Sequence, residues 1–277
     1  MIILHFGGMT MIKAVFFDID GTILSHSTKQ VPPSTKKSLQ LLKEQGILTF
    51  IATGRHISEM KDLPINDLEF EGYITLNGQY CYNDKEVIHS LPIQHEDVEN
   101  ILHEIENNPI PCIFVEKDIM YINYNNDIVA HVQESISTPL PDEGDIRRAY
   151  THPIYQVMPY GVTSQDEKNI MQLMPHCKAT RWHDLSIDII PSLGGKQNGI
   201  QKVLEYYHIQ QDETMAFGDG FNDLDMLNYV EIGIAMKNAP LEVQQNADDV
   251  TDDIDHDGIK NALIKYQVLY IDDFEGI

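Results

Sequence analysis

The chain of 277 residues has few of the groups that mark disulfide-rich, nucleic-acid-binding or membrane proteins. Its three cysteines, Cys81, Cys112 and Cys177, are far apart and form no C-x-x-C pair, so we expect reduced thiols and neither a disulfide framework nor a zinc site. Only 19 lysines and arginines stand against 43 acidic residues, and the formal net charge of −24 disfavours nucleic acid and anionic membranes as partners. No apolar run approaches the roughly 20 residues that cross a bilayer.

The first eight residues lack the basic start and the full apolar segment of a signal peptide, so we expect a cytoplasmic protein. A hydrophobic content of 42% with modest glycine and proline counts is typical of soluble globular proteins. At this length the chain can form one large domain or two. We expect a monomer or a weak homodimer.

Apolar segments alternate with amphipathic ones near the N-terminus, with short connections between them. This alternation predicts an α/β fold with a doubly wound parallel sheet. Ser34 is a plausible residue to start the first helix, and Gly46 is a plausible residue to end it. The expected strands are 14–17, 48–52 and 73–76, and the expected helices are 35–46 and 56–63.

The pattern changes at Asn77-Gly78, where short strands and a hairpin replace the alternation. We expect an α+β insertion here, with the chain returning toward the first sheet from Ser186 onward. Its expected elements are strands 79–82, 86–90, 112–116, 120–124, 155–158 and 177–181 and helices 95–106 and 166–174. Beyond it we expect strands 214–217, 231–235 and 268–271 and helices 199–207, 222–229 and 240–246.

Two carboxylates leave the C-terminal end of the first expected strand. Asp18 and Asp20 are two residues apart, so on an extended backbone they share a face. Open α/β sheets place their ligands at this edge. Mg²⁺ takes oxygen ligands and often uses one or two carboxylates together with a substrate phosphate, so the pair is a candidate magnesium site.

Four motifs in order resemble those of the haloacid dehalogenase superfamily of phosphatases. They are D-I-D-G-T at 18–22, I-A-T-G-R at 51–55, Lys196, and G-D-G-F-N-D at 218–223, and the last is most similar to the Cof-type subfamily. The resemblance spans roughly residues 11–264. It implies a Rossmann-like core with an inserted α+β cap domain, and we expect the core at 1–82 and 190–277 and the cap at 83–189. Because the usual start of the family resembles the sequence from Met11, we expect residues 1–10 to be a poorly ordered extension.

The resemblance also implies a role for each motif residue. Asp18 would be the nucleophile and would bind Mg²⁺; Asp20 would be the general acid and base and would contact the metal through its main-chain carbonyl. Asp219 would be a further metal ligand, with Asp223 behind it, fixing Lys196 or a metal-bound water. Lys196 would neutralise the nucleophile and the phosphoryl group. The phosphate-binding residues would be Ile19, Thr53, Gly54, Lys196 and Asn222.

We therefore expect a Mg²⁺-dependent phosphatase that hydrolyses small phosphomonoesters, such as sugar phosphates or phosphorylated cofactors, through an aspartyl-phosphate. Arg55 could bind an anionic substrate or form a salt bridge. Two alternatives stay open: a phosphotransferase or mutase using the same intermediate, and a non-catalytic binding protein on the same scaffold. Product analysis distinguishes a phosphatase from a phosphotransferase or mutase, because hydrolysis releases inorganic phosphate and transfer conserves the ester. A non-catalytic binding protein would release no phosphate from any phosphoester.

Overall fold

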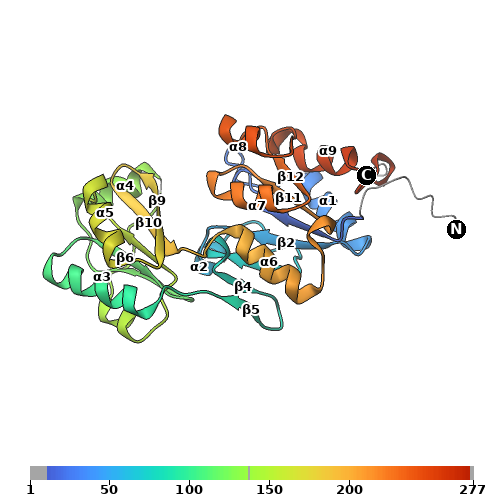
Figure 1. Cartoon of the computed structure of the whole chain (residues 1–277). Coiled ribbons are helices and arrows are strands. Elements are labelled where there is room, and N and C mark those ends of the chain that lie inside the picture. The colour runs from blue at the N-terminus through green and yellow to red at the C-terminus, as the bar shows by residue number, and fades with distance from the viewer. Residues whose placement is uncertain (1–10, 137, 275–277) are drawn as a thin grey trace. The chain divides into compact units, whose positions relative to one another are not determined.

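The computed structural model describes residues 11–136 and 138–274, which fold into two compact units (Figure 1). Unit 1 consists of the described parts of Met1–Arg55, Glu59–His89 and Gly195–Ile277. Unit 2 consists of His56–Ser58 and the described part of Ser90–Gly194. The second unit is therefore an insertion in the chain of the first. The expected extension at 1–10 lies outside the described residues.

Unit 1 is built on a sheet with strand order β13-β12-β11-β1-β2-β3-β4-β5. Its first six strands in this order pair in parallel, and β4 then pairs antiparallel with β3. Because β1 lies in the middle, the residues that follow it and its neighbours emerge at one edge. The strands are β1 (Ala14–Phe17), β2 (Leu48–Ala52), β3 (Gly72–Thr75), β4 (Tyr80–Tyr82), β5 (Val87–Ser90), β11 (Thr214–Gly218), β12 (Ile232–Ala235) and β13 (Asp249–Val250).

Helices cover both faces of this sheet, as side-chain alternation along β1 requires. Val15 and Phe17 belong to the core under α1 (Pro33–Glu44) and α9 (Gly258–Lys265). Ala14 and Phe16 belong to the core on the opposite face, under α6 (Lys196–Tyr207), α7 (Leu224–Tyr229) and α8 (Leu241–Asn246). The doubly wound parallel core predicted from the sequence is confirmed.

Unit 2 has a five-stranded antiparallel sheet of order β7-β6-β8-β10-β9. Its core contains apolar residues of α3, α5 and the sheet. An inserted α+β unit is thus also confirmed. The elements are α3 (His95–Asn107), β6 (Cys112–Val115), β7 (Met120–Ile122), α4 (Asp127–Ser135), β8 (Gln156–Pro159), α5 (Ser164–Leu173), β9 (Cys177–His183) and β10 (Ser186–Pro191).

The units divide after His89 and after Gly194, later than the boundaries placed at 82/83 and 189/190. The β4–β5 hairpin stays with unit 1 because β4 pairs with β3. The strand expected to return to the core, β10, instead pairs with β8 and β9 in the second sheet. That the two units act as a core domain and a cap domain stays a prediction.

Three local predictions were wrong, and one helix was not predicted. Ser34 lies inside α1, which begins at Pro33 with Pro32 as N-cap, because proline is pre-organised for the first helical position. The helix expected at 56–63 is only the short α2 (Ile57–Met60). Helix α4 was missed, although Asn126 caps it by accepting a hydrogen bond from the main-chain N–H of Val129. The strand expected at 268–271 is absent from the described residues, where a 3₁₀ turn (Ile271–Phe274) follows instead.

All three cysteine thiols are buried and unpaired by disulfides. Cys177 donates a weak hydrogen bond to the buried carboxylate of Asp97, which also accepts from the main-chain N–H of His176. Burial raises the pKa of the Cys81 thiol to about 12 and raises that of Cys112 and Cys177 as well. The expected reduced thiols are therefore also unreactive in the folded chain.

If the units are separate domains, core truncations should act locally. Leu102 lies in the core of unit 2 and Leu42 in that of unit 1, and both are fully buried. Replacing either leucine by alanine should cost about 2–5 kcal/mol. Hydrogen exchange should then show faster exchange in the peptides of the substituted unit alone. Equal acceleration in both units by either variant would contradict independent folding.

Candidate active site

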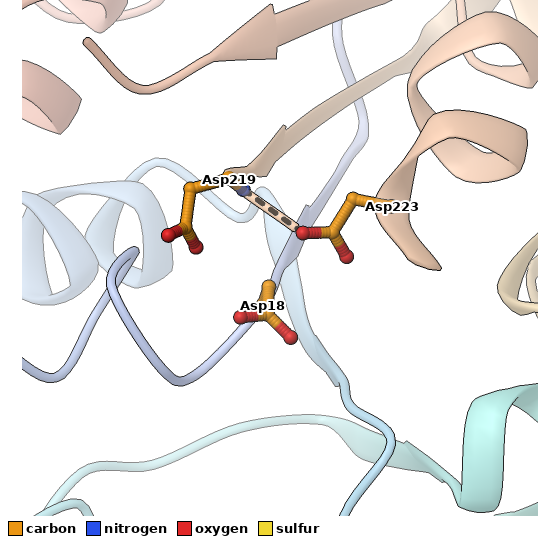
Figure 2. A group of neighbouring side chains, drawn as sticks. All are labelled: Asp18, Asp219 and Asp223. Atoms are coloured by element: carbon orange, nitrogen blue, oxygen red, sulfur yellow. Dashed lines mark hydrogen bonds between the residues drawn. The ribbon is translucent and has the colours of Figure 1, made fainter. Parts of the chain in front are cut away.

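Asp18 and Asp219 emerge side by side because their strands are neighbours. Strands β1 and β11 pair in parallel with Phe17 opposite Phe217, and each carboxylate follows its strand by one or two residues. Figure 2 shows the side chains of Asp18, Asp219 and Asp223 converging on one space. One ligand oxygen from each lies within 4.8 Å of the others. The sheet edge therefore gathers three carboxylates.

Lys196 is the cation of this cluster. It is the first residue of α6, its side chain is fully buried, and its Nζ lies 2.6 Å from Oδ1 of Asp18 and 2.5 Å from Oδ1 of Asp223. The start of α6 is held by the turn Leu76–Gly78, where the carbonyl of Asn77 accepts from the main-chain N–H of Gly195 at 2.8 Å. A Cβ at Gly78 would lie 2.0 Å from the carbonyl oxygen of Gly195, so only glycine permits this approach.

Asp223 orients both the lysine and the loop after β11. Its Oδ1 accepts from Lys196, and its Oδ2 accepts from the main-chain N–H groups of Asp219 at 2.9 Å and Gly220 at 2.8 Å. The bond to Asp219 is drawn in Figure 2. The Asp223 side chain is fully buried, so these bonds replace its hydration.

Asp219 is held in place by two neighbours that the sequence reasoning missed. Thr22 Oγ1 donates to its Oδ1 at 3.0 Å, and Asn238 Nδ2 donates both to its Oδ2 at 3.1 Å and to the carbonyl of Gly21 at 2.9 Å. Gly21 has φ +81°, and a Cβ there would lie 2.1 Å from Asp219 Oδ2. The glycine of D-I-D-G-T thus makes room for the Asp219 carboxylate.

The side chain of Asp20 lies outside this cluster and pairs with Arg55. Arg55 Nε donates to Oδ2 at 2.6 Å and its Nη2 donates to Oδ1 at 2.8 Å, a two-point contact typical of arginine and carboxylate. The hydrogen bond to Asp20 raises the pKa of Arg55. Arg55 therefore forms a salt bridge in this structure, to the carboxylate expected to act as general acid and base.

The expected phosphate-binding residues lie around the same edge. Thr53 follows β2, and its Oγ1 accepts from the main-chain N–H of Arg55 at 3.1 Å, while its own N–H donates to Ile74. Asn222 Nδ2 donates to the Asn77 side chain at 3.0 Å, and a Cβ at Gly54 would meet that same side chain at 3.0 Å. The Ile19 side chain is buried in the core, so only its main chain could contact a phosphate.

Negative charge exceeds positive charge among the six ionisable side chains of the candidate site. Asp18, Asp20, Asp219 and Asp223 face two cations, Lys196 and Arg55, which leaves a formal charge of −2. Burial first, then the charge of Asp223, raises the pKa of Asp219 to about 6. Burial raises the pKa of Asp18 to about 8 even though Lys196 opposes the shift. Burial alone would lower the pKa of Lys196, but the charges of Asp18 and Asp223 raise it.

A hard divalent cation fits this donor set. The three converging groups are all carboxylates, which suit Mg²⁺, and a charge of +2 would neutralise the excess. The elevated pKa values of Asp18 and Asp219 show that the cluster disfavours carrying all of its negative charge without a partner. These carboxylates are therefore a candidate metal site.

Comparison with known proteins agrees with the geometry. A family of haloacid dehalogenase-like hydrolases matches residues 15–263. The Bacillus subtilis protein YkrA is 35% identical over 254 residues, covering 91% of this chain and 96% of YkrA. The solved structure of the subclass IIB sugar phosphatase BT4131 has a TM-score of 0.78 and 35% identity, covering 93% of this chain and all of that one. The solved structure of the phosphatase BT1666 of Bacteroides thetaiotaomicron has a TM-score of 0.85 and 32% identity, covering 94% of this chain and 96% of that one.

The fold and the site define a phosphoric monoester hydrolase. The chain belongs to the haloacid dehalogenase family of hydrolases, in its Cof-type branch. Enzymes of this family generally use a divalent metal. Among the described residues, no helix is both long and apolar enough to span a membrane.

The metal-free protein should lose stability as pH rises. Acids whose folded pKa is raised, here from 3.8 to about 6 for Asp219 and about 8 for Asp18, stabilise the fold at low pH and lose that contribution as they ionise in the folded state. With a chelator present, the melting temperature should therefore fall between pH 4 and pH 8. Added Mg²⁺ should raise it most at pH 8. Asp219→Asn should flatten the lower part of this profile, whereas a profile that rises with pH would contradict the assignment.

Removing Asn238 should weaken metal binding without blocking the fold. Asn238→Ala deletes both hydrogen bonds from its Nδ2, so the Asp219 carboxylate loses one of its orienting contacts. We expect about a 10-fold weaker affinity for Mg²⁺, by titration calorimetry. Asn246→Ala is the matched control, because among the described residues the side chain of that exposed asparagine bonds only to the helix carbonyl of Glu242. Equal affinities in the two variants would contradict the role of Asn238.

Proposed function

We propose that the chain hydrolyses small phosphomonoesters through an aspartyl-phosphate on Asp18, with Mg²⁺ as cofactor. The observation that carries the proposal is the bond from the buried Lys196 ammonium to Asp18 Oδ1, beside Asp219. That lysine holds the expected nucleophile at the sheet edge, where the other motifs also end. Phosphatase relatives of similar length and fold support the reaction class.

Asp18, Asp219 and the main-chain carbonyl of Asp20 would hold Mg²⁺, which when bound would neutralise charge on the phosphoryl oxygens. The remaining steps belong to the side chains of this chain. An oxygen of Asp18 attacks phosphorus, so that a new oxygen–phosphorus bond forms as the bond to the leaving oxygen breaks. Lys196 offsets the negative charge that gathers at the reacting group.

Asp20 would give a proton to the leaving oxygen and would then take one from the attacking water. That water attacks the phosphorus of the aspartyl-phosphate, releasing inorganic phosphate and restoring the Asp18 carboxylate. Both carboxylate oxygens of Asp20 accept hydrogen bonds from Arg55, so one oxygen must be released from Arg55 before it can pass a proton to the leaving oxygen. Arg55 would thus set when Asp20 is available for proton transfer.

The substrate class is small phosphate esters. One relative, 26% identical over 269 residues, is the Bacillus subtilis 5-amino-6-(5-phospho-D-ribitylamino)uracil phosphatase YitU, and BT4131 is a sugar phosphatase. These two activities support sugar phosphates and phosphorylated ribitylaminouracil compounds as candidate substrates. A panel of both kinds, assayed for inorganic phosphate, tests this and also separates hydrolysis from transfer to a second alcohol.

Asp18→Asn should abolish phosphate release while leaving the fold intact. The amide cannot form the acyl-phosphate, so we expect kcat to fall at least about a thousandfold on every substrate of the panel. Asp212→Asn, at an exposed position in a 3₁₀ turn, is the matched control and should keep full activity. Circular dichroism should be the same for both variants. Turnover near that of the wild type in Asp18→Asn would remove Asp18 from the nucleophile role.

A further inference from the structure

A cavity of about 430 Å³ opens beside the Asp20–Arg55 pair, entirely within unit 1. Its walls come from the loop after D-I-D-G-T and from the segment after α2, and include Asp20, His26, Lys29, Arg55, Asp62 and Leu63. This volume is within the range of small-molecule sites. Because Asp20 is the proposed proton donor to the leaving oxygen, a cavity lined by Asp20 lies where the leaving group of a substrate would extend.

The loop that carries Lys29 is held in a fixed and uncommon conformation. Lys29 has φ +55°, a left-handed backbone conformation that residues other than glycine seldom adopt. Main-chain bonds join Lys29 N–H to the Ser25 carbonyl at 3.0 Å and Ser25 N–H to the Gln30 carbonyl at 3.1 Å. Ser27 Oγ donates to Asp255 at 2.6 Å, which ties the loop to a second segment of unit 1. The loop therefore presents Lys29 to the cavity at a defined place.

The cavity wall carries a lysine that has no carboxylate partner in the described part of the chain. Among the described residues no salt bridge joins Lys29 Nζ to a carboxylate, and Arg55 is occupied by Asp20. The His26 ring, also in the wall, offers a further hydrogen-bonding group. The wall also contains Asp62, which forms no salt bridge with Lys29. The charge of Lys29 is therefore free to attract an anion beside the leaving-group side, although the net charge of the whole chain is −24.

We propose that this cavity binds a second phosphoryl group on the substrate, with Lys29 as its main contact and His26 beside it. The preferred substrates would then be bisphosphorylated compounds whose carbon skeleton lies over the apolar surface of Leu24, Leu63 and Pro64. The inference rests on the proposed function, because that function defines Asp20 as the leaving-group side. Lys29 acts on specificity and takes no part in the bond-making steps.

Symmetric diol bisphosphates of increasing chain length test the proposal, each compared with the matching hydroxyalkyl monophosphate. In the wild type, one chain length should give about a tenfold higher kcat/KM for the bisphosphate, because Lys29 adds a charge-assisted hydrogen bond to the second phosphoryl group. Lys29→Gln should remove most of this preference, and Lys29→Arg should restore it. High salt should also reduce it.

Lys36→Gln is the matched control, because Lys36 is an exposed lysine of α1 that does not line the cavity. Its replacement changes the net charge by the same amount as Lys29→Gln. It should keep the wild-type preference. An equal loss in Lys29→Gln and Lys36→Gln, or no preference at any chain length, would overturn the proposal.

Failure of the proposed function can be told apart from failure of this inference. If the wild type released no phosphate from any monophosphate or bisphosphate, catalysis by Asp18 would be refuted. The affinity of the Asp18→Asn variant for the bisphosphates, by titration calorimetry, would then decide the cavity proposal by itself. A decrease of about tenfold on adding Lys29→Gln would support it, and unchanged affinity would overturn it.

Discussion

The site depends on one buried cation shared by two carboxylates. A fully buried ammonium is costly unless it is paired and hydrogen-bonded, and Lys196 meets both conditions through Asp18 and Asp223. Asp223 then uses its second oxygen to fix the loop that carries Asp219. Three segments far apart in the sequence are therefore held together by charge at the edge of the sheet. Neutralising Lys196 would leave Asp18 and Asp223 buried without a cation, whereas neutralising either carboxylate would leave Lys196 paired with the other.

Three of the motifs could be placed from the sequence because each follows a strand of the parallel sheet. The C-terminal ends of β1, β2 and β11 share an edge, so Asp18, Thr53 and Asp219 had to lie close together once the fold was predicted. The spacing of D-I-D-G-T predicted that the Asp18 and Asp20 side chains share one site, but the Asp20 carboxylate lies outside the cluster and pairs with Arg55 instead. Their chemical roles stay predictions, because the structure shows contacts and no reaction.

Asn77 and Asn238 could not be predicted from the sequence. Each is a single polar residue in a loop, with no spacing that marks it, and each makes its contact only after distant strands have paired. The Asp20–Arg55 pair is similar, since a lone arginine at the start of a helix has many possible partners. Strand β10 was misplaced because an apolar run of this length suits either sheet, and only its pairing with β8 and β9 decides.

The buried thiols have a practical consequence for spectroscopy. Because Cys81, Cys112 and Cys177 are all shielded, with thiol pKa values raised by burial, maleimide reagents should modify the native chain slowly. A cysteine introduced on an exposed surface of each unit could then be labelled selectively without first removing the natural ones. Fluorophores attached in this way would report distances between the two units in solution during turnover.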